Sequence, residues 1–395
     1  MKVGFIGNAN NYPFTLAQSM RRLGVEVRFL VTSIAALDRP EARFGADAVS
    51  YGDWVFDLAP MYSWDSILPT PKRTRAQELL RDCDAIVANG VMIALAARQD
   101  KPLFVICSGS DLDMAANPEY LQEICDEGRN GLRRRLRSEV KRWLYRRLIP
   151  AQRAGFRKAA GVEYALPGIL PHGDELLRDI GVDDSRRYAF MLTDLEKVPK
   201  TPLPDNDCLQ ILCVARLNWR NPLPPGFSVL DNKRTDILLN GVAEFKRRTS
   251  ERFELVLPTK GLHVEETRRL VEQLGLSENT IWLPELTQAE FMKEMQAADI
   301  IADHFGEGAI GMGARDAIAL GRPVIANGKP EIHRAFLGES LPIVQAQRPS
   351  EIAAALLELE DRALRQQLAD RARAFAERNF SAETAARTIL SLLRN

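Results

Sequence analysis

The chain has no excess of charge of either sign. Its 395 residues carry 53 Lys and Arg against 53 Asp and Glu. This balance leaves no electrostatic footprint for a nucleic-acid partner, so a polyanion would have to be met locally. No apolar run approaches the length of a membrane-spanning helix, and the opening residues MKVGFIGN read as a strand rather than an export signal. We expect a cytoplasmic protein, with at most a peripheral contact to the inner face of a membrane.

Patterns that bind metals or dinucleotides are also missing. The loop GNANNY after the first strand lacks the second and third glycines of G-x-G-x-x-G, which argues against a dinucleotide cofactor. The histidines do not cluster at metal-ligand spacing, and the five cysteines are odd in number and lack C-x-x-C pairs. We expect no metal, no cofactor, and reduced thiols that are mostly buried. These residues are His172, His263, His304 and His333, and Cys83, Cys107, Cys125, Cys208 and Cys213.

The length exceeds what a single core usually supports, and the chain repeats one order of elements twice. Short apolar strands alternate with amphipathic helices, a pattern typical of α/β, doubly wound, Rossmann-like domains. The sequence EKVPKTPLPDND resembles a linker between them. We predict an N-terminal domain at 1–195, a linker at 196–207, a C-terminal domain at 208–375, and a last helix at 376–395 that packs back on the N-terminal domain.

Nearly continuous apolar runs mark the strands of two parallel sheets. Ligands of such sheets bind beyond the carboxyl ends of the strands, so we expect a ligand cleft between the two domains. The predicted strands include 2–7, 84–90 and 102–109 in the first half, and 209–216, 253–261, 280–286, 298–305 and 322–328 in the second.

A glycine-rich segment, FGEGAIGMGARD, precedes a predicted helix that ends at Gly321. Such a turn lets backbone N–H groups approach a phosphate, and the helix N-terminus adds a favourable potential. The alternative is that the glycines only allow a tight connection between strand and helix. The candidate ligand-binding residues here are Gly306, Gly308, Ala309, Ile310, Gly311 and Gly313.

Basic residues add to this segment at the same edge of the second sheet. Arg216 closes the first strand of that domain, and Lys233 opens the helix that follows. Two cations beside a helix N-terminus suit a diphosphate, although each could be an ordinary solvated surface group. Gly261 and His304, each at the end of a predicted strand of the second sheet, complete the candidates for this ligand site.

Several segments resemble one family. DAIALGRPVIA, from Asp316, resembles the segment EAMACGKPVIA of the retaining GT-B glycosyltransferases, glycosyltransferase family four. Arg216 and Lys233 match that family's diphosphate-binding Arg and Lys, and SGSDL at 108–112 resembles its HGSDL. GNANNY and the helix after it resemble the family's opening, so the resemblance runs along nearly the whole chain in order. It implies a GT-B fold, a nucleoside-diphosphate sugar donor, retention at the anomeric carbon, and no metal requirement.

The implied chemistry needs charge stabilisation more than a protein nucleophile. Arg216, Lys233 and the loop amides would stabilise charge on the leaving diphosphate while the acceptor attacks from the same face. Asp316 would accept hydrogen bonds from a ribose diol; alternatively it only complements the helix dipole.

Two departures from the family pattern bear on the reaction. Gly308 stands where the motif has its first Glu, with Glu307 one residue earlier as its candidate replacement, and Ser108 replaces the His of HGSDL. Sixteen residues separate Arg216 from Lys233, and this loop, with Trp219, either covers the nucleotide or is a surface loop. A catalytically degenerate sugar-nucleotide-binding partner subunit and a GT-B UDP-sugar epimerase therefore stay as alternatives.

The N-terminal domain offers candidate residues for the acceptor or the sugar. Gly7 permits a close backbone approach, and Asn8, Asn10 and Asn11 offer amides; one of the three is expected to cap the next helix, leaving two for a ligand. Asp111 is the candidate catalytic base, or else a helix N-cap.

Residues 129–158 contain twelve Arg or Lys and one acidic residue, interleaved with Leu132, Leu136, Trp143, Leu144 and Leu148. This pattern predicts either a helix that lies on an anionic membrane or a helix whose apolar face packs on the domain.

Together these features predict a glycosyltransferase that uses a UDP- or GDP-sugar. Its expected acceptor is a glycan, a glycolipid or a small molecule, in polysaccharide or glycolipid assembly.

Overall fold

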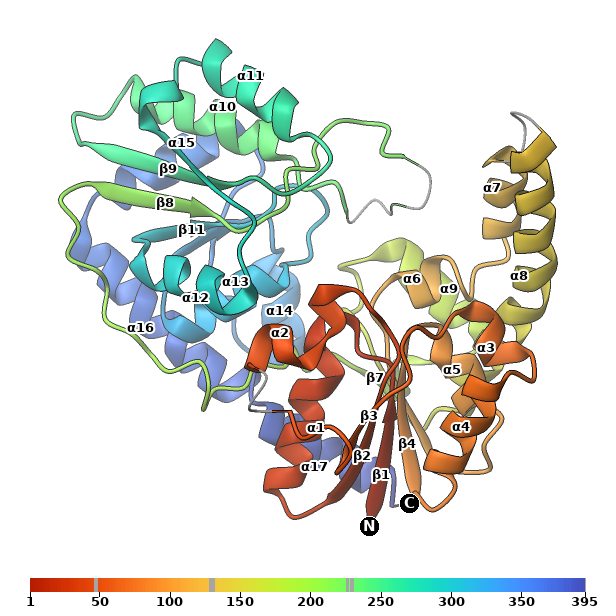
Figure 1. The fold of residues 1–395 in the computed structure, drawn as a ribbon. Helices are drawn as coiled ribbons and strands as arrows, with labels where there is room; N and C mark the ends of the chain where they lie inside the picture. Colours follow the sequence, from red (N-terminus) through yellow and green to blue (C-terminus); the bar gives the residue numbers. More distant parts are fainter. Residues whose placement is uncertain (46–48, 128–131, 225–226, 228–230, 395) are drawn as a thin grey trace. The chain divides into compact units, whose positions relative to one another are not determined.

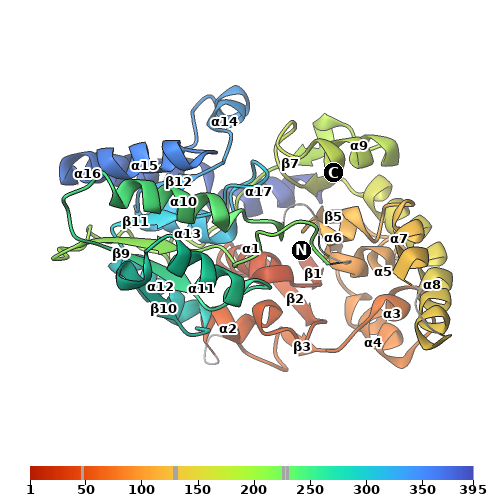
Figure 2. The same ribbon diagram turned by 90° about the horizontal axis from the view of Figure 1, so that it is seen from above.

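The computed structural model describes residues 1–45, 49–127, 132–224, 227 and 231–394 (Figures 1 and 2). The chain forms two compact units, which are described separately. The first unit comprises Met1–Leu192 and Ala382–Asn395, and the second comprises Thr193–Ser381. Part of the predicted basic stretch, 129–131, and part of the loop before Lys233 lie outside the described residues.

The first unit is built on a seven-stranded parallel sheet in the order β3-β2-β1-β4-β5-β6-β7 (Figure 1). Its central strands are buried on both faces, as their apolar runs predict. The strands are β1 (Lys2–Ile6), β2 (Glu26–Val31), β3 (Val55–Asp57), β4 (Ala85–Asn89), β5 (Leu103–Ile106), β6 (Gly161–Glu163) and β7 (Arg187–Tyr188).

Helices cover this sheet, and the last helix of the chain is one of them, because α17 packs against α1. α7 and α8 lie side by side at one edge of the unit (Figure 1). The helices of the first unit are α1 (Tyr12–Arg22), α2 (Pro40–Phe44), α3 (Ser63–Ile67), α4 (Pro71–Leu80), α5 (Ile93–Ala96), α6 (Ser110–Asp113), α7 (Tyr120–Glu127), α8 (Leu132–Lys158), α9 (Pro171–Ile180) and α17 (Ala382–Leu392).

The second unit has a six-stranded parallel sheet in the order β10-β9-β8-β11-β12-β13. Strands β8 to β10 form one half of the sheet, running outward from its centre, and strands β11 to β13 form the other half. The strands are β8 (Leu209–Cys213), β9 (Phe253–Pro258), β10 (Thr280–Leu283), β11 (Ile300–Ala302), β12 (Val324–Ala326) and β13 (Val344–Gln345).

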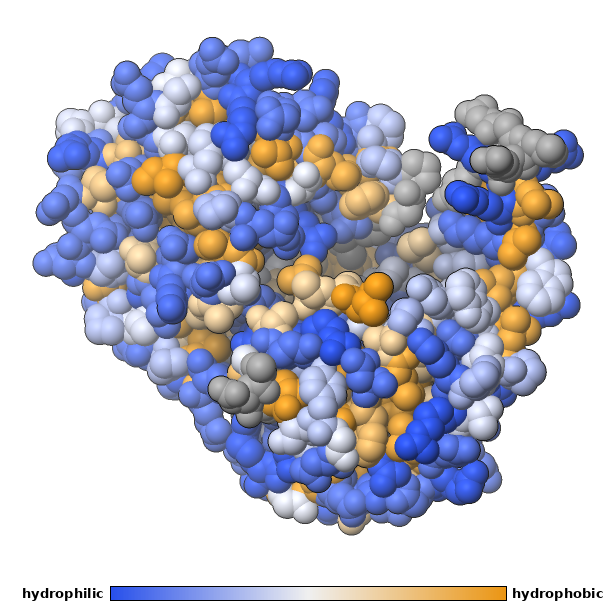
Figure 3. Space-filling view, viewed as in Figure 1, coloured by the Kyte–Doolittle hydropathy of each residue, from blue (hydrophilic) through white to orange (hydrophobic). Residues whose placement is uncertain are grey.

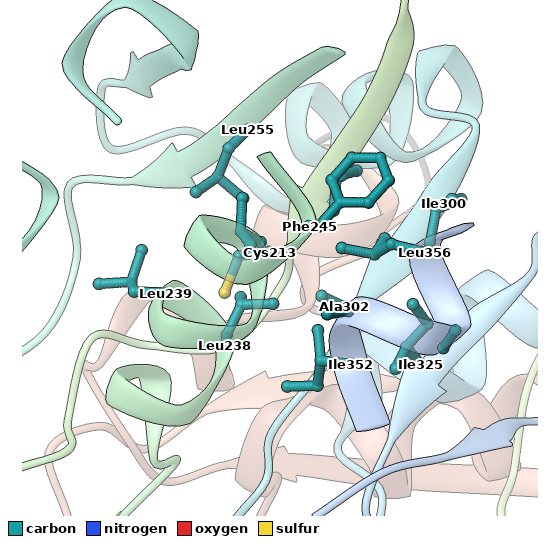
Figure 4. Close-up of a cluster of buried hydrophobic side chains, with 14 of the residues drawn as sticks. Cys213, Leu238, Leu239, Phe245, Leu255, Ile300, Ala302, Ile325, Ile352 and Leu356 are labelled. Carbon is teal, nitrogen blue, oxygen red and sulfur yellow. The ribbon is translucent and has the colours of Figure 1, made fainter. Parts of the chain in front are cut away.

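The helices of this unit pack on both faces of its sheet. α10 and α15 lie together on one face, where Leu238, Phe245, Ile352 and Leu356 meet the buried side chains of the strands (Figure 4). The helices are α10 (Thr235–Lys246), α11 (Val264–Gln273), α12 (Gln288–Ala297), α13 (Met312–Leu320), α14 (Pro330–Leu337), α15 (Pro349–Glu358) and α16 (Arg362–Asn379). The predicted fold class, α/β with two doubly wound Rossmann-like units, is confirmed.

The segment expected as a linker is partly anchored to the second unit. Arg322 is fully buried, and its guanidinium donates hydrogen bonds to the carbonyl oxygens of Thr201, Pro202 and Gln296 at 2.9, 2.9 and 2.6 Å. These bonds give the two terminal nitrogens of a buried cation backbone acceptors, so residues 201–202, a few residues before β8, are held against the second unit.

Candidate active site

The topology of the second sheet brings two predicted segments to one point. β8 and β11 are neighbours, but the chain leaves them toward opposite sides of the sheet. Such a switch point, outside the carboxyl ends of the strands, is where open α/β sheets bind ligands. Arg216 follows β8, and the glycine segment that begins at Gly306 follows β11. Arg216 is exposed, and its side chain makes no ion pair within the part of the chain that the structure describes.

Lys233 joins the loops of these two strands. Its N–H donates to the carbonyl oxygen of Asn218 at 2.6 Å, and its own carbonyl oxygen accepts from the N–H of Phe305 at 2.9 Å. Burial lowers the pKa of the Lys233 ammonium; the charges of Asp303 and Asp231 oppose this, and Arg216 adds to it. A partly buried cation beside a second cation is a site that an anion stabilises.

Neighbouring loops come so close to the segment 306–313 that two of its glycines have no space for a side chain. A Cβ at Gly306 would overlap the backbone carbonyl oxygen of Asn232, and one at Gly313 would lie 2.7 Å from the Val214 side chain. The N–H of Gly311 donates to the carboxylate of Asp303 at 2.7 Å. The predicted cradle is therefore incomplete at Gly311, because its amide already binds a buried carboxylate. α13 begins at the next residue, and its N-cap, Gly311, has no side chain with which to cap the helix.

Asn327, which follows β12, fixes the start of the loop. Its amide nitrogen donates to the carbonyl oxygen of Gly306 at 2.6 Å, and its amide oxygen accepts from Gln345 and Gln347 at 2.8 and 3.0 Å. Neither Asn327 nor Asp303 was among the predicted residues. Their positions in the sequence could have identified them as site candidates, since each is a polar residue directly after a buried apolar strand.

The loop after β9 packs on the loop after β8 through Gly261. The φ angle of Gly261 is +138°, and a Cβ at this position would lie 2.6 Å from the backbone nitrogen of Leu217. Both the backbone conformation and the lack of space therefore require glycine. The Trp219 indole donates to Thr267 at 2.9 Å. Trp219 is thus held in a packed turn on α11, which favours the surface-loop interpretation over a lid.

The other donor-side candidates differ in their exposure. Glu307 is exposed, Ala309 is partly buried and Ile310 is buried. Asp316 lies in α13 with 5% of its surface exposed, and His304 is 3% exposed. Glu307 is therefore accessible to solvent, and the roles predicted for Glu307 and Asp316 stay predictions.

We expect His304 to make stability depend on pH. Burial lowers the pKa of His304 from 6.5, Lys233 acts in the same direction, and Asp303 opposes them. The unfolded chain therefore binds a proton below pH 6.5 that the folded chain does not, so stability falls as the pH falls from 6.5 toward the folded pKa. One histidine contributes at most about 1.4 kcal/mol per pH unit.

The measurement is urea unfolding of wild type and His304→Asn at about pH 5 and pH 7.5. Burial also lowers the pKa of His333, so the variant should lose part of the acid sensitivity and retain the rest. The same loss of stability in both proteins would contradict the assignment to His304.

In the first unit, the asparagines of the N-terminal loop mainly hold the loop together. The side-chain amide of Asn8 donates to Asn11 and to the Asp38 carbonyl oxygen at 2.6 and 2.7 Å, and its oxygen accepts from the N–H of Phe14 at 3.1 Å. Asn11 donates to the carbonyl oxygens of two further residues of the turn after β2.

Asn8 therefore caps α1 from outside the helix, while Asn10 is exposed. The expectation that two of the three amides remain for a ligand is wrong, because the amide N–H groups of Asn8 and Asn11 already bind backbone and each other. Gly7, with a φ of +92°, lies against the Asn89 backbone at the switch point of the first sheet, between β1 and β4.

Asp111 is an internal acceptor rather than an accessible base. It is 1% exposed, and its carboxylate accepts from the N–H of Ser108 at 2.9 Å, from the Cys107 thiol at 3.2 Å and from the N–H of Gly90 at 3.3 Å. It joins the loops after β4 and β5, so this placement does not support the predicted role as a base. Ser108, at the position of the family His, is exposed.

α8 has an inner and an outer apolar face. Leu144 and Leu148 are buried against Ile67 and Ala94 of the first unit, whereas Leu136 and Trp143 are exposed. Leu144 and Leu148 therefore pack on the domain, as one interpretation predicts, while Leu136 and Trp143 are exposed, as the membrane interpretation requires. The side chain of Leu132 lies outside the described residues.

Metal ligands, apolar helices and thiols complete the description of this part of the chain. Among the described residues, no group of three or more His, Cys, Asp or Glu is arranged to hold a metal ion. No helix in the same part of the chain is long and apolar enough to cross a membrane. Cys83, Cys107 and Cys213 are buried free thiols, and Cys208 is a partly buried one.

Two open parallel sheets flanked by helices, with basic residues and a glycine loop at the switch point of the second, define the GT-B class of fold. Residues 228–375 match the family model described as glycosyl transferases group 1. This match lies within the second unit, and it agrees with the glycosyltransferase resemblance noted in the sequence.

Solved structures agree with this fold over the whole chain. Anabaena HepE in complex with UDP-glucose is 16% identical, with a TM-score of 0.63 over 100% of this chain and 99% of that chain. WaaG, a glycosyltransferase involved in lipopolysaccharide biosynthesis, is 15% identical, with a TM-score of 0.58 over 98% and 99%. The UDP-GlcNAc 2-epimerase from Neisseria meningitidis, bound to UDP-GlcNAc, is 14% identical, with a TM-score of 0.54 over 100% of both chains. These identities show the fold alone. No curated protein matches the chain.

Proposed function

We propose that the protein is a retaining glycosyltransferase that moves a sugar from a nucleoside diphosphate, UDP or GDP, to a hydroxyl acceptor. The observation that carries this proposal is the meeting of three features at one switch point. Arg216 follows β8, Lys233 joins the β8 and β11 loops, and the glycine loop leads into the N-terminus of α13, whose N-cap is a glycine. An anion with two charged groups, such as a diphosphate, complements this arrangement.

The reaction follows from where charge develops. The acceptor oxygen forms a bond to the anomeric carbon as the bond from that carbon to the diphosphate oxygen breaks. The acceptor proton passes to the departing diphosphate, whose growing charge Lys233 and Arg216 stabilise. These two cations take the charge that a divalent ion neutralises in other transferases, so the proposed reaction is metal-independent. Glu307, which is exposed, is proposed to bind a sugar hydroxyl, and Asp316 is proposed to bind the ribose diol.

Donor turnover tests this proposal. The protein is incubated with UDP- and GDP-hexoses and simple alkyl glycosides, and the released nucleoside diphosphate and the sugar products are quantified. We expect release that falls by about two orders of magnitude in Arg216→Ala, because a cation beside the leaving group is lost. Binding without turnover would favour the non-catalytic partner subunit. An epimeric sugar nucleotide formed without an acceptor would favour the epimerase.

We further propose that a membrane-associated glycan or glycolipid is the acceptor and that the outer face of α8 contacts the membrane. Leu136, Val140 and Trp143 recur at helical spacing on that face and are 70%, 62% and 45% exposed. Figure 3 shows apolar side chains along this edge of the molecule. The Arg147 guanidinium lies 4.0 Å from the centre of the Trp143 ring, and Arg134, Arg135 and Arg137 are exposed on the same helix. Apolar side chains among cations suit an anionic lipid surface.

Flotation with vesicles tests the membrane contact. We expect binding to vesicles that contain phosphatidylglycerol and little binding to pure phosphatidylcholine. Leu136→Ser/Trp143→Ser should bind about 30-fold more weakly, since each exposed side chain contributes on the order of 1 kcal/mol. Ile34→Ser/Phe336→Ser, which removes two exposed apolar side chains elsewhere, is the matched control. Equal binding of both double variants, or no binding of the wild type, would contradict the membrane contact.

A further inference from the structure

Lys329, which lies between β12 and α14, is held in an unusual backbone conformation. Its φ is +46°, in the left-handed region that lysine rarely adopts. The N–H groups of Lys329 and Gly328 both donate to the side-chain oxygen of Gln345, at 3.2 and 2.9 Å. The same glutamine donates to Asn327, which binds the glycine loop. This network fixes the direction in which the lysine side chain leaves the backbone.

The side chain of Lys329 runs across the face of Gly308. A Cβ at position 308 would overlap three successive carbons of the lysine, Cγ, Cδ and Cε. Glycine at 308 therefore leaves room for a cationic arm that comes from the neighbouring strand. A glutamate at this position, as in the segment that the sequence resembles, would need the same space.

Lys329 approaches the glycine loop from the side opposite to Lys233. β11 lies between β8 and β12, so the loop after β11 has Arg216 and Lys233 on its β8 side and Lys329 on its β12 side. The diphosphate is assigned to the β8 side. With the diphosphate on that side, a cation beyond it would meet one of the two groups that the diphosphate carries, the nucleoside or the sugar. The nucleoside has no anionic group of its own, whereas a sugar acid has one.

We propose that Lys329 makes the donor site selective for a nucleoside-diphosphate sugar that bears a carboxylate, a hexuronic acid. This inference rests on the proposed transferase function and names the sugar class for the same site. A carboxylate at C6 would form a charge-assisted hydrogen bond with the ammonium, whereas the neutral hexose offers only a hydroxyl. Hydrogen bonds to charged groups contribute enough to discriminate by about 10- to 100-fold.

Calorimetric binding of matched ligands tests the assignment. The probes are UDP-glucuronate against UDP-glucose, GDP-mannuronate against GDP-mannose, and UDP and GDP alone. We expect the uronate of one pair to bind at least tenfold more tightly than its neutral partner. Lys329→Met keeps the aliphatic arm over Gly308 and removes the charge, so it should abolish this preference and leave the affinity for the bare nucleoside diphosphate within about twofold.

The possible outcomes separate this inference from the function beneath it. Equal binding of uronate and hexose by the wild type would overturn the selectivity while the donor site stands. A loss of affinity for bare UDP or GDP in Lys329→Met, equal to the loss for the uronate, would make Lys329 a third diphosphate cation and overturn the inference. A wild type that binds none of these ligands would overturn the proposed function and the inference together. Lys329→Gln repeats the test if the methionine variant does not fold.

Discussion

Replacing Lys233 by alanine should lower the affinity for a nucleoside diphosphate by about 30- to 1,000-fold, equivalent to about 2–4 kcal/mol, and should lower transfer by at least as much. Lys233 is partly buried where the loops after β8 and β11 meet, and burial lowers the pKa of its ammonium while the charges of Asp303 and Asp231 raise it. A diphosphate bound there would gain a charge-assisted hydrogen bond that a smaller neutral side chain cannot make. Titration calorimetry with UDP and GDP measures the loss.

The fold should survive this substitution, because the contacts that join the two loops use the backbone of Lys233. Its N–H and carbonyl oxygen bind Asn218 and Phe305, and alanine keeps both groups. Lys246→Ala is the matched control, since Lys246 ends α10 and donates to the Gly275 carbonyl oxygen, in a different loop. Nucleotide affinity that is unchanged in Lys233→Ala, or reduced as much in the control, would remove Lys233 from the donor site.

A single methyl group at Gly306 should weaken nucleotide binding by at least tenfold and destabilise the second unit by about 1–3 kcal/mol. The added carbon would overlap the carbonyl oxygen of Asn232, which is backbone and cannot rotate away. Relief requires the glycine loop to move from the segment that carries Lys233, and the cation and the loop would then no longer face one ligand. Thermal unfolding and nucleotide titration measure the two effects.

Gly308→Ala provides the comparison within the same loop. The three atoms nearest to its methyl group are carbons of the Lys329 side chain, which can rotate, whereas the carbonyl oxygen of Asn232 cannot. We expect this variant to lose less stability than Gly306→Ala and to keep its affinity for bare UDP or GDP close to the wild type. Equal losses of stability and nucleotide affinity in both variants would contradict the specific role of the contact between Gly306 and Asn232.

The sequence predicted best those strands and helices whose structure follows from their own local pattern of residues. The apolar runs from Leu209, Phe253 and Val324 form strands β8, β9 and β12, and α13 ends before Gly321 as its pattern predicts. The short edge strands β7 and β13, of two residues each, were not predicted, because so few residues carry no periodic signal. They pair only because a neighbouring strand is already present.

Contacts between distant loops account for most of the differences at the site. Arg216, Lys233 and the glycine loop could be chosen from their positions at strand ends and from the family resemblance. Whether Asp111 is exposed could not be predicted, because its hydrogen-bond partners include Gly90, from another strand. Asn8 was misjudged for the same reason, since its amide binds a carbonyl oxygen thirty residues away at Asp38.

The central claim is that the second unit holds a nucleoside diphosphate, and a thermal-shift panel tests it most directly. Wild type and Lys233→Ala are unfolded with UDP, GDP, ADP, CMP and dTDP, each at about 100 times a micromolar Kd. One nucleoside diphosphate should raise the unfolding temperature of the wild type by about 5–10 °C, and the variant should lose the shift. If no ligand shifts the wild type, or if the variant shifts equally, the donor site is not where these loops place it.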